Sequence, residues 1–234
     1  TENKFEIPKK TLGIKSNIEP YLKDKKILNN KEQSTWTRSH GGYKNEKYSK
    51  SLNPISVDNI KDLTLEWSYE STNSFNKKNF DNVEANPVFH NGIIYSVMGD
   101  RKLVALNATN GNLLWKKQGL LTPARRGFLI SGEKSNSYIY INIGQAIAKI
   151  NSRDGSLQKE FGNKGIIYSV NSPTPPIVYK DNLYIVTATK IIVFNKISGE
   201  LLEEIKIHPN RRFYRGGVVW GGNAFDEEKG YLYV

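Results

Sequence analysis

Short apolar stretches separated by polar turns run through most of the chain, and one phrase of them recurs. At Leu103 it reads LVALNATNGNLLWKK, in which apolar positions alternate up to Asn107, a polar turn ends in Gly111, and a second apolar stretch follows. Alternation with a period of two predicts β-strands, and a turn glycine can adopt the positive φ that a tight hairpin needs. The phrase therefore predicts a β-hairpin over residues 103–117.

The same phrase returns at a fixed interval. Its turn glycines, Gly111, Gly155 and Gly199, are 44 residues apart, and the later copies read IAKINSRDGSLQKEF and IIVFNKISGELLEEI. A further phrase of the repeat, KGYLYV, starts at Lys229. A period of this length filled with short strands is the size of one four-stranded blade of a β-propeller. Helical repeats can share the length, but these segments lack the i, i+3, i+4 apolar stripe of an amphipathic helix.

The repeats set the expected fold class and divide the chain into units. We expect an all-β protein, a β-propeller of four-stranded antiparallel blades, which is incomplete because about four blades do not close a ring of about six to eight. Residues 34–234 form this partial propeller, and residues 1–33, which are polar and lysine-rich, form an arm ahead of it. We therefore expect the chain to be a piece of a longer protein. The repeat units are expected at roughly 82–117, 136–161 and 170–206, with a truncated unit from 223.

Composition narrows the partners that the chain can have. The net charge is +11, which is compatible with an anionic partner. However, the lysines are scattered through turns and no nucleic-acid-binding motif accompanies them, so we expect no nucleic acid and a solvated basic surface. An anionic cofactor in a local arginine-bearing pocket remains compatible. The sequence has no cysteine, which excludes disulfides and thiolate metal sites, and no apolar run long enough to span a membrane.

Four stretches carry information beyond the repeat itself. The first runs from Trp36 to Trp67 and contains GGY, KYS and the pattern L-x-x-I-x-x-x-N-I-x-x-L-x-x-x-W. The second is VEANPVFHNGIIYSV leading into VALNATNGNLLW, the third is RRG at Arg125–Gly127, and the fourth is GGVVWGGNAFDEEKGYLYV at the end. In this order they resemble the pyrroloquinoline-quinone (PQQ)-dependent dehydrogenases, the quinoprotein alcohol and sugar dehydrogenases. The resemblance covers most of residues 36–234.

The resemblance implies a function as well as a fold. Members of the family are eight-bladed propellers with the quinone on the central axis, and this chain resembles the N-terminal half of one. The resemblance implies a periplasmic bacterial enzyme, which can be associated with the membrane. It implies oxidation of an alcohol or a sugar with bound PQQ and transfer of the electrons to a respiratory acceptor, a quinone or a cytochrome.

Four residues match family positions that contact PQQ. The resemblance places Glu84 against the quinone with Arg126 beside it, Trp220 stacked on the ring, and Thr174 near a hydroxyl contact. PQQ is planar and carries three carboxylates, so an indole face can fix its plane and a guanidinium can bind its carboxylates or quinone oxygens. A glutamate can accept a hydrogen bond from the ring N–H. An arginine near the quinone can also stabilise negative charge as hydride arrives.

Each of these residues also has a structural interpretation that the sequence leaves open. Trp220 is flanked by glycine pairs and can be a buried packing residue, Arg126 can be a surface arginine, and Glu84 can cap the loop before a strand. Trp67 and Trp115 stand at strand ends, where we expect them to dock one blade against the next. The histidines His40, His90 and His208 lack the spacing of metal ligands.

The chain departs from the family pattern at several points. The stretch LLTPARRG lacks the adjacent cysteines of many alcohol-oxidising relatives, and IVTATKIIVF holds no acidic residue where many have a calcium ligand. These departures favour a sugar-dehydrogenase-like branch. Ca²⁺ or Mg²⁺ remains an expected cofactor, but we assign it no metal ligand here. The catalytic base of relatives would lie beyond Val234, so the catalytic residues stay unknown.

Two other functions compete with the quinoprotein hypothesis. The first is a non-catalytic propeller with PQQ-like repeats that acts as a scaffold in the bacterial envelope. It predicts that Glu84, Arg126 and Trp220 scatter over outer faces, whereas the enzyme hypothesis predicts that they face one central cavity. The second is a propeller hydrolase or a sugar-binding lectin, for which we find no Ser-His-Asp grouping and no pair of acids.

Overall fold

The computed structural model describes residues 35–48, 55–71, 83–118, 123–133, 136–207 and 222–234. The predicted polar arm over residues 1–33 lies outside them. This part of the chain is built from β-strands, with one short 3-10 helix, η2, at Ile60–Asp62. Within the same residues, no helix has the length and the apolar character that crossing a lipid bilayer requires.

The first sheet is a four-stranded antiparallel meander in which the strands pair in chain order. The predicted hairpin over residues 103–117 is confirmed as its last two strands, with Leu103 opposite Lys117. The turn between them closes through hydrogen bonds from the N–H of Gly111 to the carbonyl of Asn107 and from the N–H of Asn107 to that of Asn112. The strands are β1 (Val88–His90), β2 (Ile93–Val97), β3 (Leu103–Asn107) and β4 (Leu113–Lys117).

Two more four-stranded sheets and a hairpin follow with the same order. The second sheet contains β5 (Pro123–Ser131), β6 (Tyr138–Ile143), β7 (Ala146–Asn151) and β8 (Ile166–Tyr168). The third contains β9 (Ile177–Tyr179), β10 (Asn182–Val186), β11 (Lys190–Asn195) and β12 (Leu201–Lys206). The last is the pair β13 (Ala224–Asp226) and β14 (Tyr231–Tyr233).

The second sheet departs from the regular repeat and extends beyond the predicted unit 136–161 at both ends. After its turn the apolar stretch makes only an isolated bridge between Leu157 and Ile150, and the outer strand begins later, at Ile166. Phe161 explains the difference, because its side chain turns into the core and is fully buried, with its ring centroid 6.0 Å from that of Tyr140.

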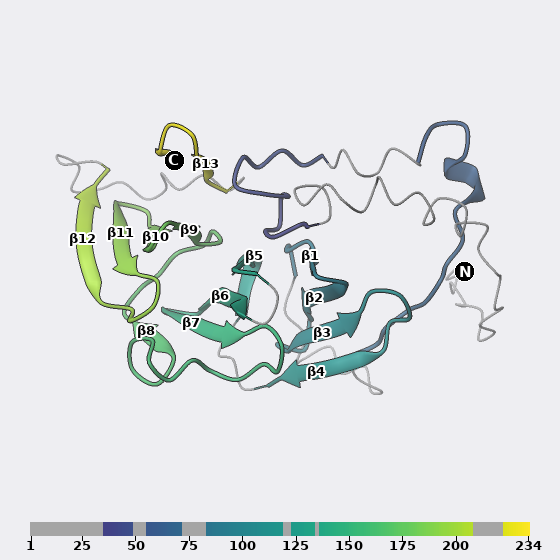
Figure 1. Ribbon diagram of the computed structural model, residues 1–234, viewed down its shortest axis with the longest axis horizontal. Coiled ribbons are helices and arrows are strands. Elements are labelled where there is room, and N and C mark those ends of the chain that lie inside the picture. The colour runs from purple at the N-terminus through teal and green to yellow at the C-terminus, as the bar shows by residue number, and fades with distance from the viewer. Residues whose placement is uncertain (1–34, 49–54, 72–82, 119–122, 134–135, 208–221) are drawn as a thin grey trace, which may run out of the picture.

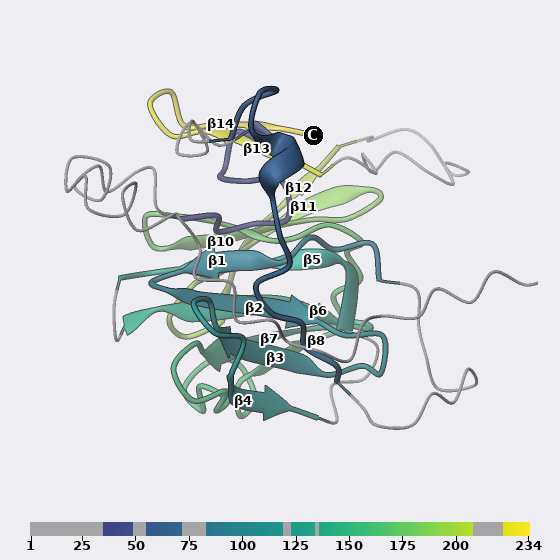
Figure 2. The ribbon, with the colours of Figure 1, turned by 90° about the vertical axis from the view of Figure 1, so that its right-hand side faces the viewer.

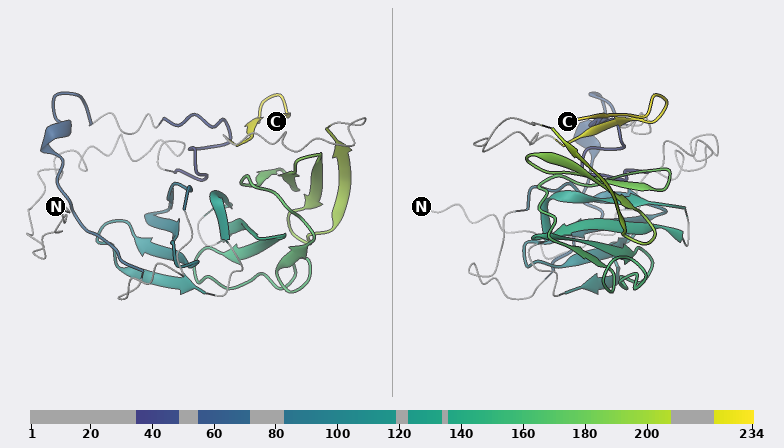
Figure 3. Two further views of the ribbon diagram at one scale, coloured as in Figure 1. Left: turned by 180° about the vertical axis from the view of Figure 1, so that it is seen from behind. Right: turned by 90° about the vertical axis from the view of Figure 1, so that its left-hand side faces the viewer.

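The sheets are arranged as the blades of a propeller, which confirms the predicted fold class. Figure 1 shows the three sheets fanning out, with β1, β5 and β9 toward a common centre and β4 and β12 at the periphery. Figure 3 shows the same open arc from behind, and Figure 2 shows the strands of neighbouring sheets stacked in layers. Side chains from facing sheets form two apolar clusters, one between the first and second sheets and one between the second and third.

Tryptophan docks one blade against the next, as predicted for Trp67 and Trp115. The Trp115 indole N–H donates to the carbonyl of Ser152 at 2.8 Å, and its ring lies against Gly155. Trp67 donates to the carbonyl of Ala108 at 3.1 Å in the same way. Both rings therefore cover the turn glycine of the following blade, Gly111 or Gly155, whereas the third turn glycine, Gly199, lies against the backbone of Gly162.

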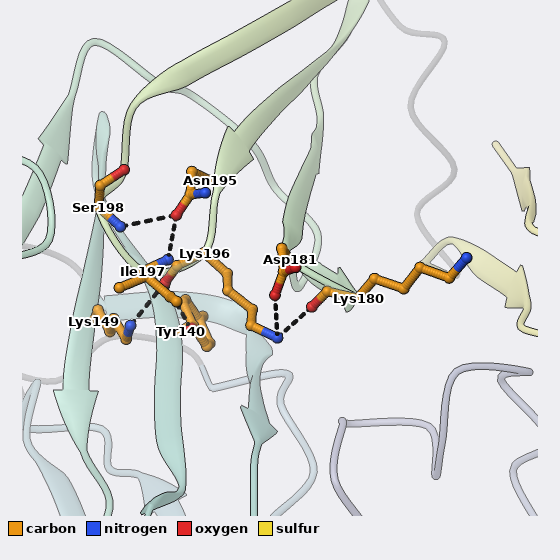
Figure 4. A network of polar contacts seen from close by, with 8 residues as sticks. All are labelled: Tyr140, Lys149, Lys180, Asp181, Asn195, Lys196, Ile197 and Ser198. Atoms are coloured by element: carbon orange, nitrogen blue, oxygen red, sulfur yellow. Dashed lines mark hydrogen bonds and ion pairs between the residues drawn. The ribbon is translucent and has the colours of Figure 1, made fainter.

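A polar network joins the second blade to the third (Figure 4). The Lys149 ammonium and the Tyr140 hydroxyl both donate to the backbone carbonyl of Lys196, at 2.7 and 3.0 Å. The Lys196 ammonium in turn lies 3.3 Å from the Asp181 carboxylate and donates to the carbonyl of Lys180. A single carbonyl at a turn of the third blade thus receives two side chains from the second.

We predict that Lys149 makes stability depend on pH. Burial, with a contribution from the charge of Lys196, lowers its pKa from 10.5 to about 8. Between those values the unfolded chain holds a proton that the folded chain has lost, so stability rises with pH. Relative to Lys149→Met, the wild-type melting temperature should therefore increase between neutral pH and about pH 9.5. Lys229→Met, at an exposed turn, is the control, and an unchanged difference between wild type and Lys149→Met would contradict the prediction.

Candidate functional site

Residues 35–48 form a crossing segment that runs over the inner strands of the blades, as Figures 1 and 3 show in purple. Trp36 exchanges two backbone hydrogen bonds with Phe89 on β1, at 2.7 and 2.9 Å. Arg38 forms a bridge with Leu129 on β5. Further along, the carbonyl of Tyr43 accepts a hydrogen bond from the first part of the last hairpin, β13. The crossing segment therefore brings its own side chains to the common centre of the fan.

Gly127 lets the crossing segment approach β5 closely. Its φ is +102°, and a Cβ there would lie 1.7 Å from the hydroxyl oxygen of Ser39. That hydroxyl donates to the carbonyl of Arg126 at 2.9 Å. The register between β5 and β6 shifts in the interval from Pro123 to Phe128, and such irregularities commonly re-aim a side chain near a functional site. Together these features fix the backbone from which Arg126 projects.

Glu84 and Arg126 form an ion pair beside this bulge. The distance from Arg126 Nη2 to Glu84 Oε2 is 2.9 Å. The side chains are 21% exposed for the arginine and 45% for the glutamate. An ion pair this open adds at most about 1 kcal/mol to stability.

Thr174 is buried just before β9, within the turn SPTPPIV. Its backbone carbonyl accepts hydrogen bonds from the Asn142 amide at 2.7 Å and from the Ser172 hydroxyl at 3.2 Å. Its hydroxyl oxygen accepts from the Asn223 amide at 3.0 Å. The Ser172 hydroxyl oxygen also lies 3.4 Å from the Thr174 hydroxyl oxygen, and either hydroxyl can donate to the other.

Arg38 lies beneath these groups and is 1% exposed. Its Nη1 donates to the carbonyl of Asn223 at 3.0 Å and its Nη2 to that of Pro175 at 3.2 Å. Burial lowers the pKa of the guanidinium to about 10, so it is charged at neutral pH. The neighbouring hydroxyl of Tyr43 has a pKa raised to about 12 by burial and is neutral there.

A narrow pocket connects these groups. It contains about 360 Å³ of free space, counted with the solvent at its mouth, of which about 30 Å³ admits the centres of water-sized molecules. That small volume suits a single carboxylate or a few waters, while a larger ligand has to lie across the mouth. Its lining includes Arg38, Ser39, Glu84, Arg126, Thr174 and Gly222.

The pocket brings together three of the four residues predicted to contact the cofactor: Glu84, Arg126 and Thr174. Trp220, the fourth, lies outside the described residues. Cofactor contact remains a prediction for all four. Among the residues that the structure describes, no group of three His, Asp or Glu side chains is placed to hold a metal ion.

Arg38 is a charged pocket residue that the sequence did not indicate, and Ser39, Asn45, Pro175 and Gly222 were not indicated either. Arg38 stands in the stretch WTRSHGGY, which resembles a packed lead-in. The sequence could have indicated it, because Arg38 stands between a tryptophan and a Gly-Gly turn. Charged side chains seldom occur in packed segments without a partner.

Comparison with known proteins agrees with this architecture. Residues 36–200 match the sequence family described as PQQ, glucose/ethanol/alcohol dehydrogenase, beta-propeller domain. Quinohemoprotein alcohol dehydrogenase ADH IIB of Pseudomonas putida is 23% identical over 84% of this chain and 33% of its own length. The 1-butanol dehydrogenase (quinone) of Thauera butanivorans is 26% identical over 60% of this chain and 22% of its own. The chain thus spans about a third or less of the length of these relatives.

Solved structures show the same fold. The quinohemoprotein alcohol dehydrogenase ADHIIG from Pseudomonas putida HK5 superimposes with a TM-score of 0.63 over 88% of this chain and 35% of its own, at 19% identity. The quinohemoprotein alcohol dehydrogenase from Comamonas testosteroni gives a TM-score of 0.56 over 78% of this chain and 28% of its own, at 20% identity. With an open arc of propeller blades and a family match over residues 36–200, the chain belongs to the glucose/ethanol/alcohol dehydrogenase β-propeller family of PQQ proteins.

Proposed function

We propose that the protein is a PQQ-dependent dehydrogenase that oxidises an alcohol or a sugar and passes the electrons to a quinone or cytochrome acceptor. The observation that carries the proposal is the meeting of Glu84, Arg126 and Thr174 in one pocket at the common centre of the blades. A scaffold has no need of such a set, and the scaffold hypothesis predicts that the two charged residues lie on outer faces. We also propose a periplasmic location, as in the family that the sequence resembles.

The chemistry of the pocket fits PQQ. Its carboxylates are anions, and the lining offers two guanidinium groups and a threonine hydroxyl. We propose that one carboxylate enters the narrow hollow, where Arg126 and the Thr174 hydroxyl donate hydrogen bonds to it. The flat ring then lies across the mouth, where Trp220 is the predicted stacking partner.

When bound, PQQ supplies a two-electron acceptor for the hydrogen and electrons that an alcohol loses on oxidation to a carbonyl compound. The residues of this chain bind and orient it. Arg126 fixes an anionic edge through charge-assisted hydrogen bonds, and Glu84 fixes Arg126. The Asn142 amide binds the backbone carbonyl of Thr174 and the Asn223 amide binds its hydroxyl oxygen, so Thr174 is held at the wall of the pocket.

The substrate class is proposed from the relatives. Two of the curated relatives carry alcohol or 1-butanol dehydrogenase in their names, so we propose an alcohol first. The departures of this sequence from the family pattern favour a sugar as the second candidate. Ca²⁺ or Mg²⁺ is proposed as the accompanying ion. The described residues offer it no cluster of acidic or histidine ligands, so we assign none.

The proposal is tested by adding PQQ with Ca²⁺ or Mg²⁺ to the full-length protein. We expect saturable binding, followed by the change in quinone absorbance, and dye-linked oxidation of members of a panel of alcohols and aldoses. The pattern of substrates then separates the alcohol from the sugar interpretation. No binding together with no oxidation would contradict the proposal and would favour a scaffold.

A further inference from the structure

Arg38 is a buried cation without a counter-charge among the described residues. Its guanidinium donates to the carbonyls of Asn223 and Pro175 and to the side-chain oxygen of Asn45, all of which are uncharged. Burying an ion without an opposite charge is costly, and proteins usually pair such groups. By contrast, the other arginine of the pocket, Arg126, is balanced by Glu84.

The hydrogen bonding around Arg38 is also unfinished. Its Nε has no partner within the described part of the chain, although it is shielded from solvent. The same is true of the amide oxygens of Asn142 and Asn223. All three side chains donate hydrogen bonds to Thr174 or Pro175, and both of these residues line the pocket.

Charge and geometry together point to an anion. Of the lining residues, Arg38 and Arg126 each bring one positive charge and Glu84 one negative charge, so the excess is that of Arg38. We propose that Arg38 is a second cationic contact for the carboxylate that enters the pocket, in addition to Arg126. This inference rests on the proposed binding of PQQ, and it names the residue that supplies the uncompensated charge.

The test compares PQQ affinity among variants of the full-length protein. Arg38→Gln removes the charge and keeps a polar side chain, and we expect it to weaken PQQ binding about 10- to 100-fold. Binding should also become less sensitive to salt, because one ionic contact is lost. Arg153→Gln removes the same charge from an exposed turn of the second blade and should bind PQQ like the wild type.

Arg38→Lys separates a ligand contact from a structural clamp and serves if Arg38→Gln fails to fold. Lysine keeps the charge but loses the planar fork, so we expect about 10-fold weaker binding with the salt dependence of the wild type. Wild-type affinity in the folded Arg38→Gln or Arg38→Lys variant would overturn the inference. So would an equal loss in Arg153→Gln.

Citrate, a simple tricarboxylate, distinguishes this inference from the proposed function. The wild type can fail to bind PQQ while citrate still raises its melting temperature. If Arg38→Gln then abolishes that increase, the anion site is supported and the assignment of PQQ is wrong. If neither PQQ nor citrate binds the wild type, both fall. If PQQ binds and Arg38→Gln binds it equally well, only the role of Arg38 is wrong.

Discussion

Replacing Arg126 with methionine is expected to weaken PQQ binding by about 100-fold, at least as much as any other single change at the pocket. The variant loses a charge-assisted contact to the ligand, and it also leaves the Glu84 carboxylate without its partner 2.9 Å away. That carboxylate then repels the carboxylates of PQQ. The dissociation constant, measured by absorbance titration of the full-length protein, gives the effect directly.

Two comparisons show whether the loss arises at the site. Glu84→Gln keeps an acceptor and releases Arg126, so its affinity should fall much less, by about 10-fold or below. Lys190→Met removes a cation from an ion pair with Glu204 on the outer strands β11 and β12, and should leave the affinity unchanged. Equal affinity in Arg126→Met and the wild type would show that the pocket does not bind the quinone through this guanidinium.

Replacing Gly155 with alanine is expected to destabilise the protein by about 2–4 kcal/mol. Two effects add. The residue has φ of +73°, which costs a residue with a Cβ about 1 kcal/mol or more. Its Cβ would also lie 2.8 Å from the Trp115 ring, so the docking tryptophan has to move, at a typical cost of about 1–3 kcal/mol. Chemical and thermal unfolding of the full-length protein measure the change.

Gly92 provides a matched control. Its φ is +74°, and a Cβ there would meet nothing within 4 Å, so Gly92→Ala should show only the backbone effect, about 1 kcal/mol. Adding Trp115→Phe to Gly155→Ala should recover part of the loss, since a smaller ring leaves room for the methyl group. If the two glycine variants are equally destabilised, the contact with Trp115 does not hold the blades together.

The regular features of the fold follow from the sequence because they are local and repeated. The turn at Gly111 and the alternating strands around it define a hairpin from neighbouring residues alone, and the 44-residue spacing of the turn glycines multiplies it into blades. The docking role of Trp67 and Trp115 was also predictable, although the expected strand ends were wrong: Trp67 lies in a segment without a strand, and Trp115 is the middle residue of β4. The second blade was harder to predict from the sequence. Phe161 does not follow the alternating pattern of a strand, and its buried position depends on packing that only the folded structure shows.

The pocket was predictable only in part. The family resemblance indicated Glu84, Arg126 and Thr174, but Arg38 gains its meaning from partners far along the chain. The carbonyls that it binds belong to residues 137 and 185 positions away. Neither periodicity nor composition carries information about contacts at that separation. A buried charge therefore becomes visible only when its surroundings are known.

The central claim is that the pocket at the centre of the blades receives an anionic edge of PQQ, and a structure of the full-length protein with bound PQQ tests it most directly. We predict a PQQ carboxylate within about 3 Å of the Arg126 guanidinium, with the Thr174 hydroxyl donating to the same group. A quinone bound elsewhere, with both residues unchanged and out of reach, would contradict the account.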